Sequence, residues 1–375
     1  MFDLSLKKYG YQELLIAIIL NVFGLIFIQS SLQSNMSILM SQLMISIISL
    51  IFCLVISFLN LKRALARYEI FYVFLLMALL SIIIIGTASG RNSTRWIEVP
   101  IINAKLQPSE FVKLFFIIYM SKYIEKTGIM INRFGNLIKV VIFFAIPFVM
   151  ILAQPNLSSS LILLFIFISM LFASHLDLKW FIGGGLIVTI LIFIIYLTAV
   201  NGLLYRFPIL KDYQKQRIVS FFSPTEDDQG TYQQENSIMA IGSGRLFGKG
   251  INNDSTQSVK NGNWLVEEQN DFIFAIVGEE IGFFGSLIII LLYIFLIISC
   301  LFIAGGQREE YKKLICVGIA GWIATQSFVN LGVATGVLPN TGVPLPFFSQ
   351  GGSSLLSIYM AMGLIINIKR DVRGR

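Results

Sequence analysis

The chain has 375 residues, of which 56% are hydrophobic and only 13% are charged. An ordinary soluble domain carries roughly 25% charged residues, so this composition and the mean hydropathy of +0.78 exclude a soluble globular protein. The net charge of +7 comes with no basic tail and no basic-aromatic stripe, so we expect no nucleic-acid binding. A single His and three Cys also argue against a His-rich metal cluster and a disulfide scaffold.

Ten apolar stretches follow one another along the chain, and each is close to the roughly 20 residues that a bilayer core requires. They predict an all-α fold, a polytopic membrane helical bundle of about ten transmembrane helices. We expect a single domain over residues 1–375. The predicted spans are residues 12–32, 37–59, 69–88, 108–124, 138–153, 157–174, 178–199, 272–304, 312–336 and 346–368.

The basic residues alternate between the two sides of these spans. Of the 28 Lys and Arg residues, 17 fall on the side that also holds both chain ends. The positive-inside rule assigns that side to the cytoplasm. We therefore expect cytoplasmic N- and C-termini, contact with anionic membrane lipids, and a large extracellular loop over residues 200–271.

Two ionisable residues lie inside the fourth predicted span. Glu110 and Lys113 are three residues apart, so they share one helix face and can neutralise each other. An ionisable residue within a span costs several kcal/mol unless it is paired or hydrated. The pair is either a structural ion pair that stabilises the bundle or part of a site for an anionic headgroup.

The eighth predicted span is too long and carries two adjacent acids. At about 1.5 Å per residue, residues 272–304 would extend roughly 50 Å, which exceeds the bilayer thickness. We expect its first part, with Gly282 and Gly285, to bend or project outward and to line a wet cavity. Glu279 and Glu280 point about 100° apart on a helix, so they cannot share one partner.

Asp271 stands where this long helix is expected to begin, at the outer face. From there its carboxylate can serve as a base over the membrane surface. The alternative is an N-terminal helix cap, which the local sequence by itself favours.

Three of the ten outer cations fall in the loop over residues 89–107, against the charge bias. They are Arg91, Arg95 and Lys105, with Trp96 between them. Arginine forks suit pyrophosphate oxygens. The alternative is contact with phospholipid headgroups, with Trp96 in the aromatic belt of the membrane.

Residues 341–354 enter the last predicted span through two prolines and a pair of glycines. Free main-chain amides at that helix start, beside Ser353 and Ser354, could hold an anion. The segment has no Lys of the kind found in a phosphate loop, so we do not expect nucleotide binding.

In this order, these motifs resemble the SEDS family of polytopic membrane glycosyltransferases, which includes RodA, FtsW and SpoVE. The resemblance covers nearly the whole chain, and the ordered set is far more specific than any single motif. It is carried by residues 95–96, 107–110, 113, 154–155, 240–244, 271–275, 278–280 and 341–354.

The resemblance implies that the chain polymerises lipid II, an undecaprenyl-pyrophosphate disaccharide-peptide, into peptidoglycan strands at the outer face of the bacterial cytoplasmic membrane. Asp271 matches the catalytic aspartate of the family, which makes it the general base instead of a helix cap. Lipid II is α-linked and the strands are β-1,4 linked, so one inverting displacement suffices. The candidate substrate contacts are Arg91, Arg95, Trp96, Lys105, Glu110, Lys113, Glu279, Ser353 and Ser354.

The family also implies a partner, a class B penicillin-binding protein transpeptidase. We expect no obligatory cofactor. A divalent cation, Mg²⁺ or Mn²⁺, between Asp271 and the phosphates is compatible with the chemistry, but no ligand cluster in the sequence supports it.

This sequence departs from the family pattern at several positions. Asn156 stands where the family has Asp, and Gln269 and Asn270 replace a His-Thr pair before the catalytic aspartate. Gln350 replaces a Tyr, and Arg245 replaces the second Gly of a Gly-Gly-Leu-Phe-Gly motif. These changes indicate a divergent subtype, and they leave elongation, division and sporulation open as its role.

Two other functions are compatible with the sequence. A flippase or transporter of lipid-linked precursors would use the intramembrane charges for passage and would need no outward base. A scaffold that recruits a penicillin-binding protein would need no chemistry at all. A glycosyltransferase differs from both because it requires the carboxylate of Asp271.

Overall fold

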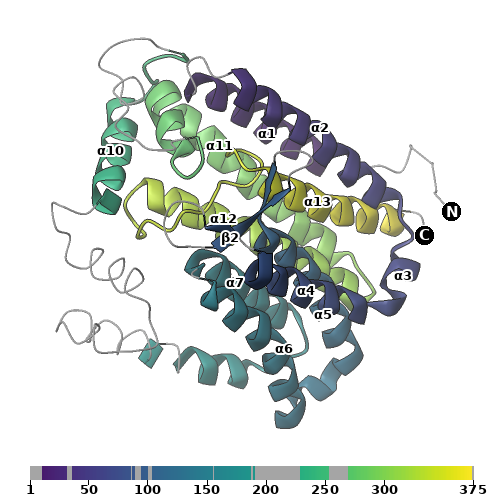
Figure 1. Cartoon of the computed structure of the whole chain (residues 1–375). Coiled ribbons are helices and arrows are strands. Elements are labelled where there is room, and N and C mark those ends of the chain that lie inside the picture. The colour runs from purple at the N-terminus through teal and green to yellow at the C-terminus, as the bar shows by residue number, and fades with distance from the viewer. Residues whose placement is uncertain are drawn as a thin grey trace.

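Helices form most of the structure, a computed structural model that describes residues 11–31, 36–85, 87–88, 94–99, 104–154, 156–186, 189–190, 229–252 and 269–373. Two 3-10 turns, η2 (Leu65–Arg67) and η3 (Gly128–Asn132), connect some of them. In chain order the helices are α1 (Gln12–Ser31), α2 (Met36–Phe58), α3 (Leu61–Ala64), α4 (Glu69–Ile85), α5 (Pro108–Thr127), α6 (Phe134–Ala153), α7 (Leu157–Ala173), α10 (Gln229–Ser243), α11 (Ile273–Gly305), α12 (Glu310–Ala334) and α13 (Gly352–Arg373) (Figure 1).

In the described part of the chain, six helices are long and apolar enough to cross a membrane, namely α1, α2, α6, α11, α12 and α13. The segment from α3 to α4, bent by 65°, makes a seventh if it is one span. Three predicted spans are not among these helices. Helix α5 carries several charges, and α7 has only 17 residues. Residues 178–199 lie partly outside the described residues. The chain is a multi-pass helical membrane protein.

Helix α2 shows how the bundle is adapted to lipid. Its inward side is polar and small, with Gln42, Ser46 and Ser49 buried, whereas Met44 and Ile47 are exposed. This distribution is the reverse of a soluble helix and suits a lipid solvent, where small residues allow close helix packing. The small face packs against α13, which lies beside α2 in Figure 1.

Basic residues from distant parts of the chain meet at one end of the bundle. Lys369 near the end of α13 forms a buried ion pair with Glu13 in the first turn of α1, at 2.7 Å. Lys122 near the end of α5 lies 3.3 Å from the ring centre of Tyr311, at the start of α12. The start of α1 and the end of α13 therefore lie on one side of the bundle, as the charge pattern predicts.

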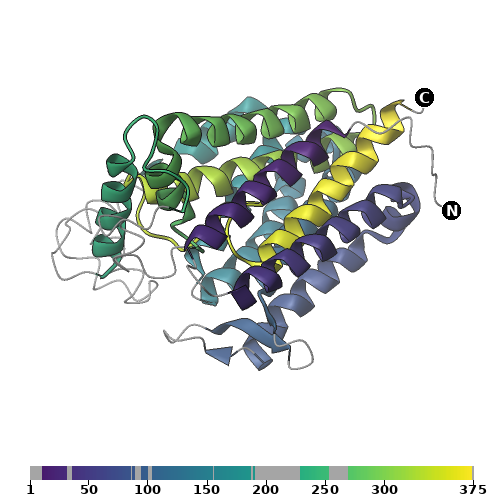
Figure 2. The same ribbon diagram turned by 90° about the horizontal axis from the view of Figure 1, so that it is seen from above.

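The bend predicted in the long helix is confirmed. Inside α11, Gly282 has φ 66° and ψ −163°, a left-handed conformation that glycine adopts at little cost. The part of α11 before the bend packs against α10 and against the turn that follows it (Figure 2).

A small antiparallel sheet connects α4 to α5. Its strands β1 (Thr87–Ala88), β2 (Thr94–Val99) and β3 (Ala104–Leu106) lie in that order, next to α4 at one edge of the molecule (Figure 2). The predicted span over residues 69–88 is too long at its C-terminal end, because α4 ends at Ile85 and Thr87 begins a strand. The sheet adds one β element to the predicted helical bundle.

Candidate active site

Residues 341–351 connect α12 to α13 as irregular backbone and are largely buried. Irregular backbone at membrane depth must find hydrogen-bond partners within the protein, and Phe347 has a left-handed φ of 63°. Side-chain donors from four helices form hydrogen bonds to carbonyl oxygens of residues 341–351. These bonds run from Ser158 to Thr341, from Asn330 to Val343, from Gln326 to Pro344, from Tyr293 to Pro346 and from Asn21 to Phe347.

Asp271 lies against this segment. Its main-chain oxygen accepts a hydrogen bond from Nδ2 of Asn330 at 2.9 Å, and the same amide donates to the oxygen of Val343 at 2.7 Å. A Cβ added to Gly342 would lie 3.2 Å from Oδ2 of Asp271, so the carboxylate lies over the backbone of that glycine. Asp271 is half-buried. A carboxylate in such a position can accept a proton from a group that approaches from the exposed side.

The helix-cap alternative does not describe Asp271. Helix α11 begins at Ile273, and its N-cap residue is Phe272. Asp271 therefore precedes the cap position by one residue. Two residues that depart from the family pattern meet beside it, because the main-chain N–H of Gln350 donates to the oxygen of Gln269 at 3.0 Å.

The predicted pairing of Glu110 with Lys113 is confirmed. Nζ of Lys113 lies 2.8 Å from both carboxylate oxygens of Glu110 and 3.1 Å from Oε1 of Gln326. The ring centre of Trp322 is 4.8 Å from the same ammonium group. Lys113 is 0% exposed, and these three oxygens engage its three donors. In this structure the lysine faces no solvent from which a headgroup could reach it.

Gln326 links this ion pair to the irregular segment. Its Nε2 donates to the oxygen of Pro344 at 2.9 Å and lies 3.4 Å from Oγ of Ser354. The hydroxyl of Ser353 accepts a hydrogen bond from the main-chain N–H of Gln107 at 2.9 Å. Both serine hydroxyls thus have partners inside the protein. The segment from residue 341 to residue 354 joins Asp271 at one end to the Glu110–Lys113 pair at the other.

Two of the three candidate pyrophosphate-binding cations lie in the small sheet. Arg95 is in β2 and Lys105 is in β3, where Lys105 is paired in register with Glu98. Trp96 is half-buried and pairs with Thr87 of β1. Strand β3 leads directly into α5, which carries Glu110. Arg91 lies outside the described residues, and the structure describes only the backbone of Arg95 and Lys105.

Glu279 and Glu280 have separate partners, as their helical spacing predicts. Nζ of Lys249 lies 2.6 Å from Oε1 of Glu279. Oε1 of Glu280 accepts hydrogen bonds from Ser30 and, at 3.2 Å, from the main-chain N–H of Asn252. Both acids contact the turn after α10, and Glu279 lies roughly 9 Å along the helix from its first residue, Ile273, at 1.5 Å per residue. Glu279 therefore belongs to a second cluster, distinct from the one around Asp271.

Sequence reasoning missed the amide side chains that build the site. Asn21, Gln326 and Asn330 lie in apolar helices and are buried, and each donates to the segment over residues 341–351. An uncharged amide in a membrane span is also costly without a partner. A search for amides as well as ionisable residues would have found them.

The described residues do not provide a site for a divalent cation. No group of three or more His, Cys, Asp or Glu side chains in this part of the chain lies close enough to hold a metal ion. Around Asp271 the described partners are amides and main-chain oxygens.

The sequence matches a known family over almost its full length. A family described as cell cycle protein, FtsW/RodA/SpoVE, matches residues 11–374. The chain belongs to this family. One relative is stage V sporulation protein E of Bacillus subtilis, 36% identical over 299 residues that cover 79% of this chain and 76% of the relative. Another is the probable peptidoglycan glycosyltransferase FtsW of Buchnera aphidicola subsp. Schizaphis graminum, 34% identical over 302 residues that cover 79% and 80%.

Solved structures show that the fold is shared. One is a chain from a peptidoglycan synthase complex, determined in work on the coordination of polymerization and crosslinking. It is 24% identical with a TM-score of 0.79, and the match covers 99% of both chains. The rod shape determining protein RodA of Thermus thermophilus is 23% identical with a TM-score of 0.66 over 97% of both chains. The helical bundle described here is therefore the FtsW/RodA/SpoVE fold.

Proposed function

We propose that the chain is a peptidoglycan glycosyltransferase that polymerises lipid II at the outer face of the bacterial cytoplasmic membrane. One observation carries the proposal: Asn330 binds the main-chain oxygen of half-buried Asp271, and the carboxylate of Asp271 lies over Gly342. A base fixed in this way suits proton abstraction from a sugar hydroxyl. The names of the FtsW relatives support the same activity.

In the proposed reaction, Asp271 accepts the proton of the acceptor hydroxyl. The oxygen attacks the anomeric carbon of the donor sugar, and the bond from that carbon to the pyrophosphate breaks. Undecaprenyl pyrophosphate leaves from the opposite face, so the α-linkage becomes a β-1,4 linkage. A positioned general base typically contributes ~10²- to 10⁴-fold to the rate.

The departing pyrophosphate needs positive charge. Arg91, Arg95 and Lys105 are the cations that the sequence places in the outer loop over residues 89–107, and Arg95 and Lys105 lie in the sheet that leads into α5. We assign pyrophosphate binding to these three, with Trp96 among them. Arginine forks can bind two phosphate oxygens at once.

We assign Lys113 and Glu110 a positioning role. The ion pair is buried and neutral, and it holds Gln326 against the irregular segment on which Asp271 lies. Hydrogen bonds through Lys113 and Gln326 therefore connect α5 to the segment beside the proposed base. This arrangement agrees with a structural ion pair and not with a site for an anionic headgroup.

The proposal includes orientation and a partner. The end of the bundle that collects Lys369, Lys312 and Lys122 faces the cytoplasm under the positive-inside rule, so both termini are inside and Asp271 is outside. The structural neighbour in a peptidoglycan synthase complex supports a class B penicillin-binding protein transpeptidase as partner.

The decisive experiment uses the purified protein in liposomes with labelled lipid II, scored separately for glycan polymer and for translocation across the bilayer. We expect polymer without translocation. Translocation without polymer would identify a flippase. If the protein forms no polymer and translocates no lipid II even with the partner transpeptidase present, the scaffold function would be favoured.

The partner is tested by crosslinking in native membranes followed by identification of the crosslinked proteins. We expect a class B penicillin-binding protein among them. Full polymerising activity in membranes that yield no such transpeptidase would contradict obligate pairing.

A further inference from the structure

The turn after α10 is fixed to the bent part of α11. The main-chain N–H of Phe283 donates to the oxygen of Arg245 at 2.8 Å, and that of Gly250 donates to the oxygen of Glu280 at 3.0 Å. A Cβ on Gly248 would collide with the carbonyl of Glu280, so the two backbones are in direct contact. This turn is a rigid element that rests on the helix.

Arg245 occupies a costly position in this turn. Its φ is +51°, in the left-handed region that favours glycine. The side chain is exposed, so packing in a core does not offset the backbone strain. Arg245 has no ion-pair partner within the described residues. A strained, exposed and unpaired cation indicates a function outside the fold itself.

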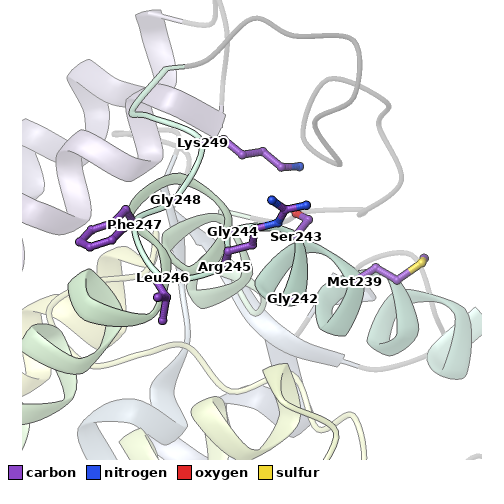
Figure 3. A pocket seen from close by; sticks show the side chains of 9 residues that line it. All are labelled: Met239, Gly242, Ser243, Gly244, Arg245, Leu246, Phe247, Gly248 and Lys249. Atoms are coloured by element: carbon purple, nitrogen blue, oxygen red, sulfur yellow. The ribbon is translucent and has the colours of Figure 1, made fainter.

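A pocket of about 1020 Å³ opens beside this arginine, lined by Met239 and residues 242–249. Figure 3 shows the side chains of Arg245 and Lys249 reaching the same side of the turn, near Ser243. The charge of Lys249 is matched by Glu279 at 2.6 Å. Arg245 therefore gives the pocket an excess of positive charge.

The surroundings of the pocket are apolar and exposed. Phe247 is 79% exposed and Phe283 is 57% exposed, and the rings of Phe247 and Phe284 are 5.4 Å apart. Phe247 lies in the turn after α10, whereas Phe283 and Phe284 directly follow the bend of the membrane-spanning helix α11. An arginine that shares a pocket with the exposed ring of Phe247, next to a membrane-spanning helix, matches a ligand with an anionic head and an apolar chain.

We propose that this pocket binds the phosphate of a membrane lipid. The guanidinium of Arg245 binds the phosphate oxygens with bidentate geometry, and the lipid chain lies over Phe247 and Phe283. Both an anionic phospholipid and a lipid-linked pyrophosphate carry this chemistry. The inference does not depend on the proposed role of Asp271, because it concerns a separate cluster and a binding event without a chemical step.

The test measures lipid binding to the purified full chain by native mass spectrometry and by the ligand-dependent rise in melting temperature. Dioleoylphosphatidylglycerol and undecaprenyl pyrophosphate are the phosphate-bearing probes. Dioleoylglycerol and undecaprenol are their matched controls without phosphate. We expect at least one phosphate-bearing probe to bind more tightly than its control, and the tighter of the two identifies the source of the phosphate.

Arg245→Gly is the informative variant because glycine suits the left-handed backbone. We expect its melting temperature without lipid to equal or exceed that of the wild type, while its affinity for the phosphate-bearing probe falls roughly tenfold. Arg245→Gln removes the charge but keeps a long side chain, and it should lose affinity to the same extent. Arg308→Gln removes one exposed cation beyond the other end of α11 and should leave binding unchanged.

Wild-type affinity in both Arg245 variants would overturn the proposal. So would equal binding of a probe and its phosphate-free control, or no binding of either phosphate-bearing probe. An equal loss of affinity in Arg308→Gln would also overturn it, since the effect would then follow from net charge alone.

Discussion

The side-chain amide of Asn330 donates to the main-chain oxygen of Asp271 at 2.9 Å, and the same group holds Val343 at 2.7 Å. Asn330 thus fixes the proposed base relative to the irregular segment. We expect Asn330→Ala to lower kcat for polymerisation roughly 10- to 100-fold, because small displacements of a positioned group are costly in rate. KM for lipid II should change little, and steady-state kinetics with purified enzyme measures both.

Asn367 provides a matched control for that variant. It lies in α13 and donates to two main-chain oxygens, those of Ile56 at 2.9 Å and Leu59 at 2.6 Å, near the end of the bundle that holds Lys369. Asn367→Ala should cost similar stability, about 1–3 kcal/mol for each carbonyl left unsatisfied, but it should keep a near-normal kcat. An equal fall of kcat in both variants would show that Asn330 acts only through stability.

Asp271→Asn tests the proposed base directly. Asn has nearly the same size and can keep the main-chain contact to Asn330, so folding and lipid II binding should persist. It cannot accept the proton of the acceptor hydroxyl, and polymerisation should fall by ~10²-fold or more. The measurement is glycan-strand formation, with melting temperature as the folding control. Near-normal polymer from the variant would rule out Asp271 as the base.

The Glu110–Lys113 pair should behave as one unit. Lys113→Met leaves a carboxylate buried without its cation, and Glu110→Gln leaves the ammonium without its anion; breaking a buried pair in this way costs ~3–5 kcal/mol. The double variant should be more stable than either single variant, as measured by thermal unfolding in detergent. If the double variant shows the sum of both losses instead, the two residues are stabilised by other partners.

The exposed pair Asp177–Lys179 is the control for this cycle. Its atoms are 2.7 Å apart, but the two side chains are 47% and 66% exposed. Removing either charge should change the free energy of unfolding by less than ~1 kcal/mol. The contrast isolates burial as the cause of the coupling.

Orientation can be tested with introduced thiols. Cys53, Cys300 and Cys316 are all buried, so the native chain should react little with an impermeant thiol reagent. In intact cells we expect Gln229→Cys, at the start of α10, to be labelled. Gln307→Cys, between α11 and α12, should be labelled only after the membrane is opened. Labelling of the Gln307 variant in intact cells would reverse the assigned orientation.

Local spacing was sufficient to predict part of this structure. Glu110 and Lys113 are three residues apart on one helix, so their pairing depends on nothing distant. The bend at Gly282 follows from the length of an apolar run that exceeds the membrane. In both cases the cause lies within a single element of the chain.

The rest could not be predicted because it depends on contacts between distant elements. The oxygens of residues 341–351 take donors from α1, α7, α11 and α12, and no pattern within one helix shows which carbonyl each amide will meet. Strands β1 and β3 have only two and three residues, too few to show an alternating pattern. The placement of Asp271 over Gly342 likewise arises from the packing of α11 against the segment before α13.

The buried pair of Glu13 and Lys369 joins residues 356 positions apart in the sequence. During biosynthesis, α1 enters the membrane long before α13 has been translated. Until then the ammonium group that neutralises Glu13 does not exist, and the carboxylate is without that partner. The first and last helices can therefore dock only after synthesis is nearly complete. A chain that stops before α13 keeps an acidic group that its own fold cannot neutralise in this way.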